Sequence, residues 1–226
     1  MDITAVIPVR AGSTRIKDKN IKPFAGSSLL EIKIEQLKRI PTVNEIIVSS
    51  DSRHMLNIAQ EHGVKALERP YEYCDEKTKT FGETVQYIAK NNIKSKVMMW
   101  VPCVCPCLAD ETISKGISIF ESIIRDGLPY DSIASAVLIK EYLFDEKNPI
   151  NFTIKNHVPS QQLPNWHYIV NGFFIANTID MYNWKFVYGS VPFLYELNKI
   201  ESIDIDDQVD FEYAEYIYKK IYIYKK

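Results

Sequence analysis

The sequence has no strong net charge, no long apolar run and few cysteines, and each shortage excludes a class of protein. Its 27 basic side chains nearly balance 29 acidic ones, giving a formal charge of -2. No global field therefore recruits nucleic acid or an anionic membrane, and any anion site must be local. No apolar stretch approaches the ~20 residues of a membrane span, and residues 1–3 lead into a strand rather than a signal peptide. We expect a soluble, untargeted protein.

The four cysteines are too few and too close together for a disulfide framework. Cys103, Cys105 and Cys107 alternate along one short run, and only Cys74 lies elsewhere. This pattern favours a reduced, cytoplasmic setting. Structural zinc prefers two residues between paired ligands and a second such pair, and none of the 4 histidines sits in a metal or triad pattern. We expect buried thiols rather than a metal site.

Apolar, β-branched runs alternate with segments of helical periodicity along most of the chain. Strands are predicted at 4–9, 45–51, 97–101 and 132–137, and helices at 28–37, 54–62, 82–91, 110–125 and 208–218. This order predicts an α/β protein with a mostly parallel sheet, right-handed crossovers and helices on both faces. Without an internal repeat or a linker, residues 1–226 are expected to form a single domain.

The pattern changes between residues 140 and 184, where prolines and aromatics replace clean periodicity. We expect an insertion of hairpins or irregular strands at about 140–190. Large aromatics dominate interface energetics, so the insertion suits the contact of a homodimer; a lid packed on its own core is the alternative. Residues 203–206 then return to strand-like character. Residues 218–226 suggest a frayed helix end or an edge segment.

The loop at residues 10–20, directly after the first predicted strand, combines four cations with Gly12. Ligands of open α/β sheets bind beyond the carboxyl ends of the strands, and a glycine lets the backbone approach them closely. Arg10 and Arg15 suit bidentate contacts to phosphate, and Lys19 suits a point charge on a leaving pyrophosphate. The loop lacks both the dinucleotide glycine spacing and the Walker pattern. We predict a phosphate-binding loop for a nucleoside triphosphate, with a solvated surface loop as the alternative.

Asp204 and Asp206 form a second polar cluster, with an i, i+2 spacing that points both carboxylates to one side of a strand. Mg2+ takes oxygen ligands and is commonly held by one or two carboxylates together with substrate phosphates. Asp207 and Asp210 follow, so an acidic cap on the last helix is the alternative.

Two motifs, IPVRAGS at residues 7–13 and KNIKPFAG at 19–26, resemble the signature of acylneuraminate cytidylyltransferases, also called CMP-sialic acid synthetases. The resemblance continues at 48–51, 68–70, 162–164, 171–172 and 204–206. It implies a three-layer, Rossmann-like nucleotidyltransferase fold with a small extended dimerisation insertion. It also implies transfer of CMP from CTP to the anomeric hydroxyl of a nonulosonic acid such as sialic acid, with Mg2+ and release of pyrophosphate.

Site residues follow from these motifs and from the resemblance. The expected catalytic residues are Arg10, Lys19, Asp204 and Asp206, and the two aspartates are the expected Mg2+ ligands. The expected substrate-binding residues are Ala11, Gly12, Ser13, Arg15, Asn20, Ser50, Asp51, Arg69, Gln162 and Asn171. Catalysis would rest on positioning and charge neutralisation during in-line attack on the α-phosphate. The proton of the attacking hydroxyl has three candidate acceptors: Asp204, Asp206 or a metal-bound hydroxide.

The chain departs from the family at two places. A Pro-Thr-Ser-Pro-like turn is replaced by PCVCPC at residues 102–107, which removes hydroxyls that would bind substrate and leaves Cys105 as a weaker donor. The family's arginine before its Gln-x-Leu-Pro segment is absent, so Lys140 or Lys155 compensates or the acceptor differs. Two alternatives to the leading function stay open: a nucleotidyltransferase for another base or acceptor, and a catalytically weak nucleotide-binding scaffold.

Overall fold

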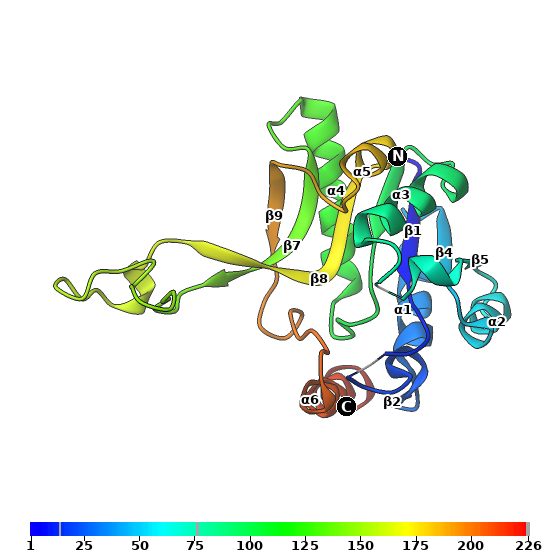
Figure 1. Ribbon diagram of the computed structural model, residues 1–226, viewed down its shortest axis with the longest axis horizontal. Coiled ribbons are helices and arrows are strands. Elements are labelled where there is room, and N and C mark those ends of the chain that lie inside the picture. Colours follow the sequence, from blue (N-terminus) through cyan, green and yellow to red (C-terminus); the bar gives the residue numbers. More distant parts are fainter. Residues whose placement is uncertain (14, 76, 225–226) are drawn as a thin grey trace.

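The computed structural model describes residues 1–13, 15–75 and 77–224, and within them one seven-stranded sheet forms the centre of the molecule (Figure 1). Across the sheet the strands are β5 (Lys65–Glu68), β4 (Glu45–Ser50), β1 (Ile3–Pro8), β6 (Val97–Trp100), β8 (Trp166–Asn177), β7 (Ser132–Ile139) and β9 (Pro192–Glu196). Each neighbouring pair is parallel except the two pairs that contain β8, which runs antiparallel to β6 and β7. The predicted mostly parallel sheet is confirmed.

Helices cover both faces of the sheet, as the alternation of side chains in β1 shows. Ile3, Ala5 and Ile7 belong to a core packed by α1 (Leu29–Lys38), α2 (Arg53–Glu61), α4 (Asp110–Asp126) and α6 (Gln208–Tyr218). Val6 points the other way, into a smaller core with α3 (Phe81–Asn92) and α5 (Thr178–Trp184). Successive strand residues face opposite sides, so both faces of β1 are buried. The predicted three-layer α/β fold is confirmed.

Local signals explain where the helices begin and end. The Ser28 side chain accepts the Glu31 N–H at the start of α1, and the Ser52 side chain accepts the Met55 N–H at the start of α2. The five predicted helices agree with the structure within one residue at each end. None of the helices in the described part of the chain has the length and hydropathy that crossing a bilayer requires.

The predicted insertion at about 140–190 is too wide. Its second half contains β8, which lies inside the sheet, and α5, which packs on the smaller core. Aromatic content hid this strand, because its first half is largely exposed and only its second half is buried. The insertion itself is an arm at residues 140–165, which projects far from the sheet between β7 and β8 (Figure 1).

Four short strands outside the predicted insertion were not expected: β5, β9, and β2 (Pro23–Phe24) with β3 (Ser27–Ser28), which pair as a hairpin. The strand expected at 203–206 does not form; this segment carries no regular secondary structure. In place of a sheet ladder, the Ile205 N–H donates to the Val104 carbonyl and the Ile205 carbonyl accepts from Lys19. The N–H groups of Ile203 and Asp206 find acceptors within four residues along the chain. At the other end of α6 the chain continues as a π-helix, Lys219–Ile223, and residues 225–226 lie outside the described part.

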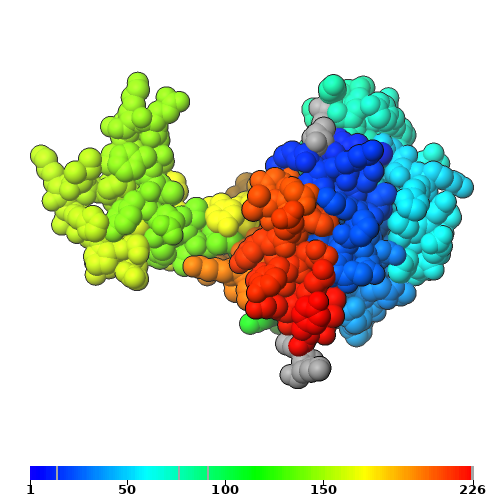
Figure 2. Space-filling model, turned by 90° about the horizontal axis from the view of Figure 1, so that it is seen from below, coloured from blue at the N-terminus to red at the C-terminus, as the bar shows by residue number. Residues whose placement is uncertain are grey.

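Helix α6 packs on the hairpin near the start of the chain. The rings of Phe24 and Phe211 meet edge to face at 5.3 Å, and the Ala25 N–H donates to the Glu215 Oε1 atom at 2.7 Å. Figure 2 shows the last part of the chain, in orange and red, lying against the first part, in blue. This contact carries residues 204–206 to the loop at 10–20.

Replacing Glu83 with glutamine tests the cap of α3 through its pH dependence. Hydrogen bonds from the Thr80 backbone, the Lys79 side chain and the Thr80 hydroxyl lower the pKa of Glu83 from 4.5 to about 2. A lowered carboxylate pKa stabilises the fold above the unfolded value of 4.5, and this contribution is lost as the pH falls through about 2. At neutral pH we expect Glu83→Gln to lower the Tm by roughly 2–4 °C.

The difference in Tm should shrink as the pH is lowered through that window, because the parent carboxyl then becomes protonated. Thermal unfolding followed by circular dichroism across the acid range measures it. A difference that stays constant with pH would contradict the assignment.

Candidate active site

A cleft of about 750 Å³ opens where the carboxyl ends of β1 and β6 lie side by side. This size is typical of small-molecule sites. Strand β1 pairs with β4 on one side and with β6 on the other. Open α/β sheets bind their ligands beyond the carboxyl ends of such neighbouring strands. The loop after β1, the turn after β6, the first half of β8 and the segment at 204–206 all contribute to its wall.

Most of the predicted site residues meet in this cleft. Those that line it are Arg10, Ser13, Arg15, Lys19, Asn20, Arg69, Asn171, Asp204 and Asp206. Thr14, which belongs to the predicted phosphate loop, lies outside the described residues. The basic loop and the aspartate pair, 186 residues apart at Lys19 and Ile205, therefore share one site.

Five predicted residues do not line the cleft: Ala11, Gly12, Ser50, Asp51 and Gln162. Asp51 shapes the loop instead, because its Oδ1 atom accepts the Ala11 N–H at 2.9 Å. Gly12 has a φ of 70°, a left-handed conformation that other side chains rarely adopt. The Ser50 hydroxyl is buried and accepts the Ser52 N–H at 3.0 Å. Gln162 lies in the arm, away from the cleft of its own chain.

Lys19 joins the basic loop to the aspartate segment. Its Nζ atom donates to the Ile205 carbonyl at 2.5 Å. Burial lowers the pKa of Lys19, and the nearby carboxylates of Asp204 and Asp206 oppose that shift. Arg15 reaches the same segment, with its Nη2 atom 2.8 Å from the Asp206 Oδ1 atom. Because both partners of that ion pair are more than half exposed, it is weak and easily exchanged for a ligand.

The two carboxylate oxygens of Asp204 differ in their hydrogen bonding. Its Oδ2 atom accepts the Asn171 side-chain amide at 3.0 Å, but its Oδ1 atom is buried and has no hydrogen-bond partner among the described residues. Burial raises the pKa of Asp204, and the Asn171 hydrogen bond opposes the rise. A buried carboxylate oxygen without a partner is costly unless a ligand satisfies it.

The donor set at Asp204 and Asp206 fits Mg2+, which takes hard oxygen ligands. Within the described residues no three or more His, Cys, Asp or Glu side chains form a complete metal site. Two carboxylates beside a cationic cleft match the way in which Mg2+ is held partly by protein and partly by substrate phosphates and water.

Two arginines, Arg10 and Arg69, are held by hydrogen bonds that involve Cys74. Arg69 is 4% exposed, and its guanidinium donates to the Val9 carbonyl at 2.9 Å and the Cys74 Sγ atom at 2.9 Å. The Arg10 Nη1 atom donates to the Cys74 carbonyl at 3.1 Å. Both cations are therefore held in fixed positions at the wall of the cleft.

One part of the cleft wall is aromatic, and the sequence did not predict it. The Phe81 ring meets Trp100 edge to face at 5.7 Å and Phe186 at 5.5 Å, and Phe174 and Tyr188 complete this side. The pattern Thr80-x-x-Glu83 is a capping box that could have placed the start of α3 here. Nothing local in the sequence marks the residues that follow α5.

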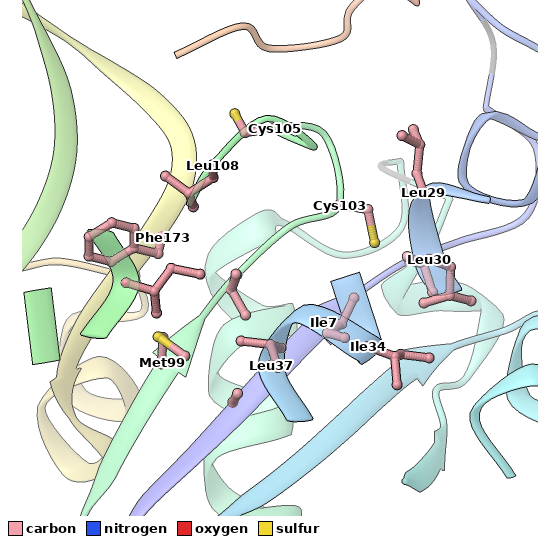
Figure 3. Packing of buried hydrophobic residues seen from close by; sticks show 14 of the residues in the cluster. Ile7, Leu29, Leu30, Ile34, Leu37, Met99, Cys103, Cys105, Leu108 and Phe173 are labelled. Atoms are coloured by element: carbon pink, nitrogen blue, oxygen red, sulfur yellow. The ribbon is translucent and has the colours of Figure 1, made fainter. Parts of the chain in front are cut away.

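The cysteine turn, residues 102–108, contributes its first three residues to the wall of the cleft. Figure 3 shows Cys103 and Cys105 on this turn together with core residues such as Leu29 and Leu108. The four cysteines are free and buried, in agreement with the expected thiols. Cys103 lines the cleft, but Cys105 does not, so the expected contact of Cys105 with substrate is not seen in this arrangement.

The thiols of Cys103 and Cys107 should be inert in the folded protein. Burial raises the pKa of each from 9.0 to about 12, so the thiolate fraction falls roughly 1000-fold. We expect reaction with an aromatic disulfide reagent at neutral pH to be at least roughly 10-fold slower than that of a free thiol, because a raised pKa lowers the thiolate fraction more than it increases nucleophilicity. Unfolding in guanidinium is the control, because it should release all four thiols; rapid reaction without denaturant would contradict the burial.

Comparison with known proteins gives a consistent result. A profile of the cytidylyltransferase family matches residues 4–126. The chain is 25% identical to the N-acylneuraminate cytidylyltransferase of Escherichia coli O18:K1:H7, over 96% of this chain and 52% of that protein. It is 23% identical to the pseudaminic acid cytidylyltransferase of Campylobacter jejuni subsp. jejuni serotype O:23/36, over 95% of both chains.

The fold is that of a solved CMP:2-keto-3-deoxy-manno-octonic acid synthetase complexed with CTP, with a TM-score of 0.69. That match has 12% identity and covers 97% of this chain and 99% of the other. The chain spans about half the length of the N-acylneuraminate cytidylyltransferases it matches.

Proposed function

The chain belongs to the cytidylyltransferase family, and from this premise we propose that it transfers CMP from CTP to the anomeric hydroxyl of a nonulosonic, sialic-acid-like sugar acid. One observation carries the proposal: Lys19 and Arg15 of the basic loop touch the segment of Asp204 and Asp206 inside one cleft. The relatives named for N-acylneuraminate and pseudaminic acid support this acceptor class.

In this proposal the cationic wall binds the triphosphate. Arg10, Arg15 and Lys19 neutralise phosphate oxygens, and Ser13 and Asn20 add polar contacts from the same loop. Arg15 exchanges its weak ion pair with Asp206 for a phosphate. Because the protein supplies positioning and charge rather than a covalent intermediate, the main catalytic effect is electrostatic stabilisation of the departing pyrophosphate.

We assign Mg2+ to Asp204 and Asp206. The unpaired Oδ1 atom of Asp204 supports this assignment, since it is a buried oxygen donor without a partner among the described residues. When bound, the ion would neutralise charge on the phosphate oxygens. Asn171 holds the other oxygen of Asp204 and so fixes the direction in which the free one points.

The acid group of the acceptor needs a cation other than those expected from the sequence. The Lys140 Nζ atom donates to the Leu163 carbonyl and to the Asn165 Oδ1 atom, both at 2.6 Å. Neither Lys140 nor Lys155 lines the cleft of its own chain. These two lysines therefore do not replace the family's arginine within a single chain.

We propose a homodimer formed through the arm. Phe144, Ile150 and Ile154 of the arm are 55%, 44% and 74% exposed, and the arm stands away from the rest of the molecule (Figure 2). Exposed apolar side chains on a projecting segment suit a partner surface. Sedimentation should give twice the chain mass, and Ile154→Arg should shift the protein to monomer; a monomeric parent would refute the dimer.

The proposed activity is tested by incubating the protein with each nucleoside triphosphate, Mg2+ and a panel of sugar acids, and measuring pyrophosphate. We expect release only with CTP and a nonulosonic acid. Release with another base or acceptor would support a different nucleotidyltransferase. CTP binding without release for any acceptor would support a nucleotide-binding scaffold instead.

Lys19→Ala should lower kcat/KM for CMP transfer roughly 100- to 1000-fold, because it removes a fixed charge from the leaving group. Lys17→Ala is the matched control, since Lys17 is exposed on the same loop and does not line the cleft. Steady-state kinetics with varied CTP measure both variants. Unchanged turnover in Lys19→Ala would remove this residue from the mechanism.

A further inference from the structure

Lys33 is fully buried in α1, on the face that packs into the main core with Leu30, Ile34 and Leu37. Removing an ammonium from water has a large desolvation cost, and burial lowers the pKa of Lys33 accordingly. An apolar side chain would suit this position better for stability alone. Stability therefore does not explain why a lysine stands at position 33.

Lys33 and Gln36 together hold the cysteine turn. The Lys33 Nζ atom donates to the Gln36 Oε1 atom at 2.6 Å and to the Cys105 carbonyl at 3.4 Å. The Gln36 amide donates to the Leu108 carbonyl at 2.5 Å. Carbonyls of a buried turn have no sheet partners, so donors from α1 fix the turn at its middle and at its end.

The cysteine turn also holds the segment at 204–206. The Val104 carbonyl accepts the Ile205 N–H at 3.0 Å. Ile205 stands between the two aspartates. A displacement of the turn therefore moves the carboxylates of Asp204 and Asp206 relative to Lys19.

We propose that Lys33, with Gln36, is a positioning residue for the CMP transfer proposed above. The pair sets the cysteine turn and, through Val104, the place of the two carboxylates. It touches neither substrate nor metal. The proposal rests on the proposed CMP transfer for its kinetic readout and on the assignment of the metal to Asp204 and Asp206 for its metal-binding readout, so the two readouts can fail separately.

Lys33→Met tests it, because methionine matches the aliphatic part of the lysine side chain and lacks the terminal donor. We expect kcat to fall roughly 10- to 100-fold and the Mn2+ Kd in the presence of CTP to rise by a similar factor, as when partners of metal ligands are lost. The KM for CTP should stay within about 3-fold, since Arg10 of the basic loop is held by the Cys74 carbonyl and not by the cysteine turn. Electron paramagnetic resonance of Mn2+ and steady-state kinetics measure these quantities.

Lys38→Met is the matched control, because Lys38 lies on the same helix, is exposed and binds Glu35 on the surface. It should match the parent in every measurement. Gln36→Leu is the second variant, used if Lys33→Met does not fold. It should likewise lower kcat and leave the KM for CTP nearly unchanged.

Parent-like kcat and Mn2+ affinity in a folded Lys33→Met or Gln36→Leu protein would overturn the proposal. Failure of both variants to fold would also overturn it, because the pair would then serve the fold rather than the site. A parent that binds Mn2+ and CTP but transfers nothing would refute the proposed function, while weaker Mn2+ binding by Lys33→Met would still support the positioning role.

Discussion

The cleft depends on how one residue, Ile205, is held. Its side chain is fully buried in the main core, its N–H donates to the Val104 carbonyl, and its carbonyl accepts the Lys19 ammonium. Buried peptide groups must be paired, so these bonds tie the last segment of the chain to the cysteine turn and to the basic loop. With Ile205 fixed, Asp204 and Asp206 lie on either side of it at the wall of the cleft.

Burial gives this wall its chemical character. The same partial removal from water lowers the pKa of Lys19 and raises that of Asp204, so each charge is costly until its counterpart arrives. A triphosphate and a divalent cation would supply both counterparts together. Contacts to Ile205 and Asn171 hold Lys19 and Asp204 in place within the cleft.

Strand β8 connects the arm, the aspartate side of the cleft and the two hydrophobic cores. Its first residues leave the arm, Asn171 in its middle binds Asp204, and Phe173 to Ala176 are buried in the two cores. Its antiparallel direction lets the chain return from the arm into the centre of the sheet. The sequence analysis assigned this strand to the insertion because its exposed half is aromatic and shows no period.

The sequence pattern predicts five helices, four strands and the loop at 10–20, because periodicity, caps and basic clusters are local properties of neighbouring residues. It also supplied the aspartate pair, although it placed them on a strand that does not form. It is the folded chain that makes Asp51 shape the loop, puts Gln162 in the arm and gathers aromatic residues along the cleft. These outcomes depend on contacts between distant segments, and such contacts leave no period in the chain.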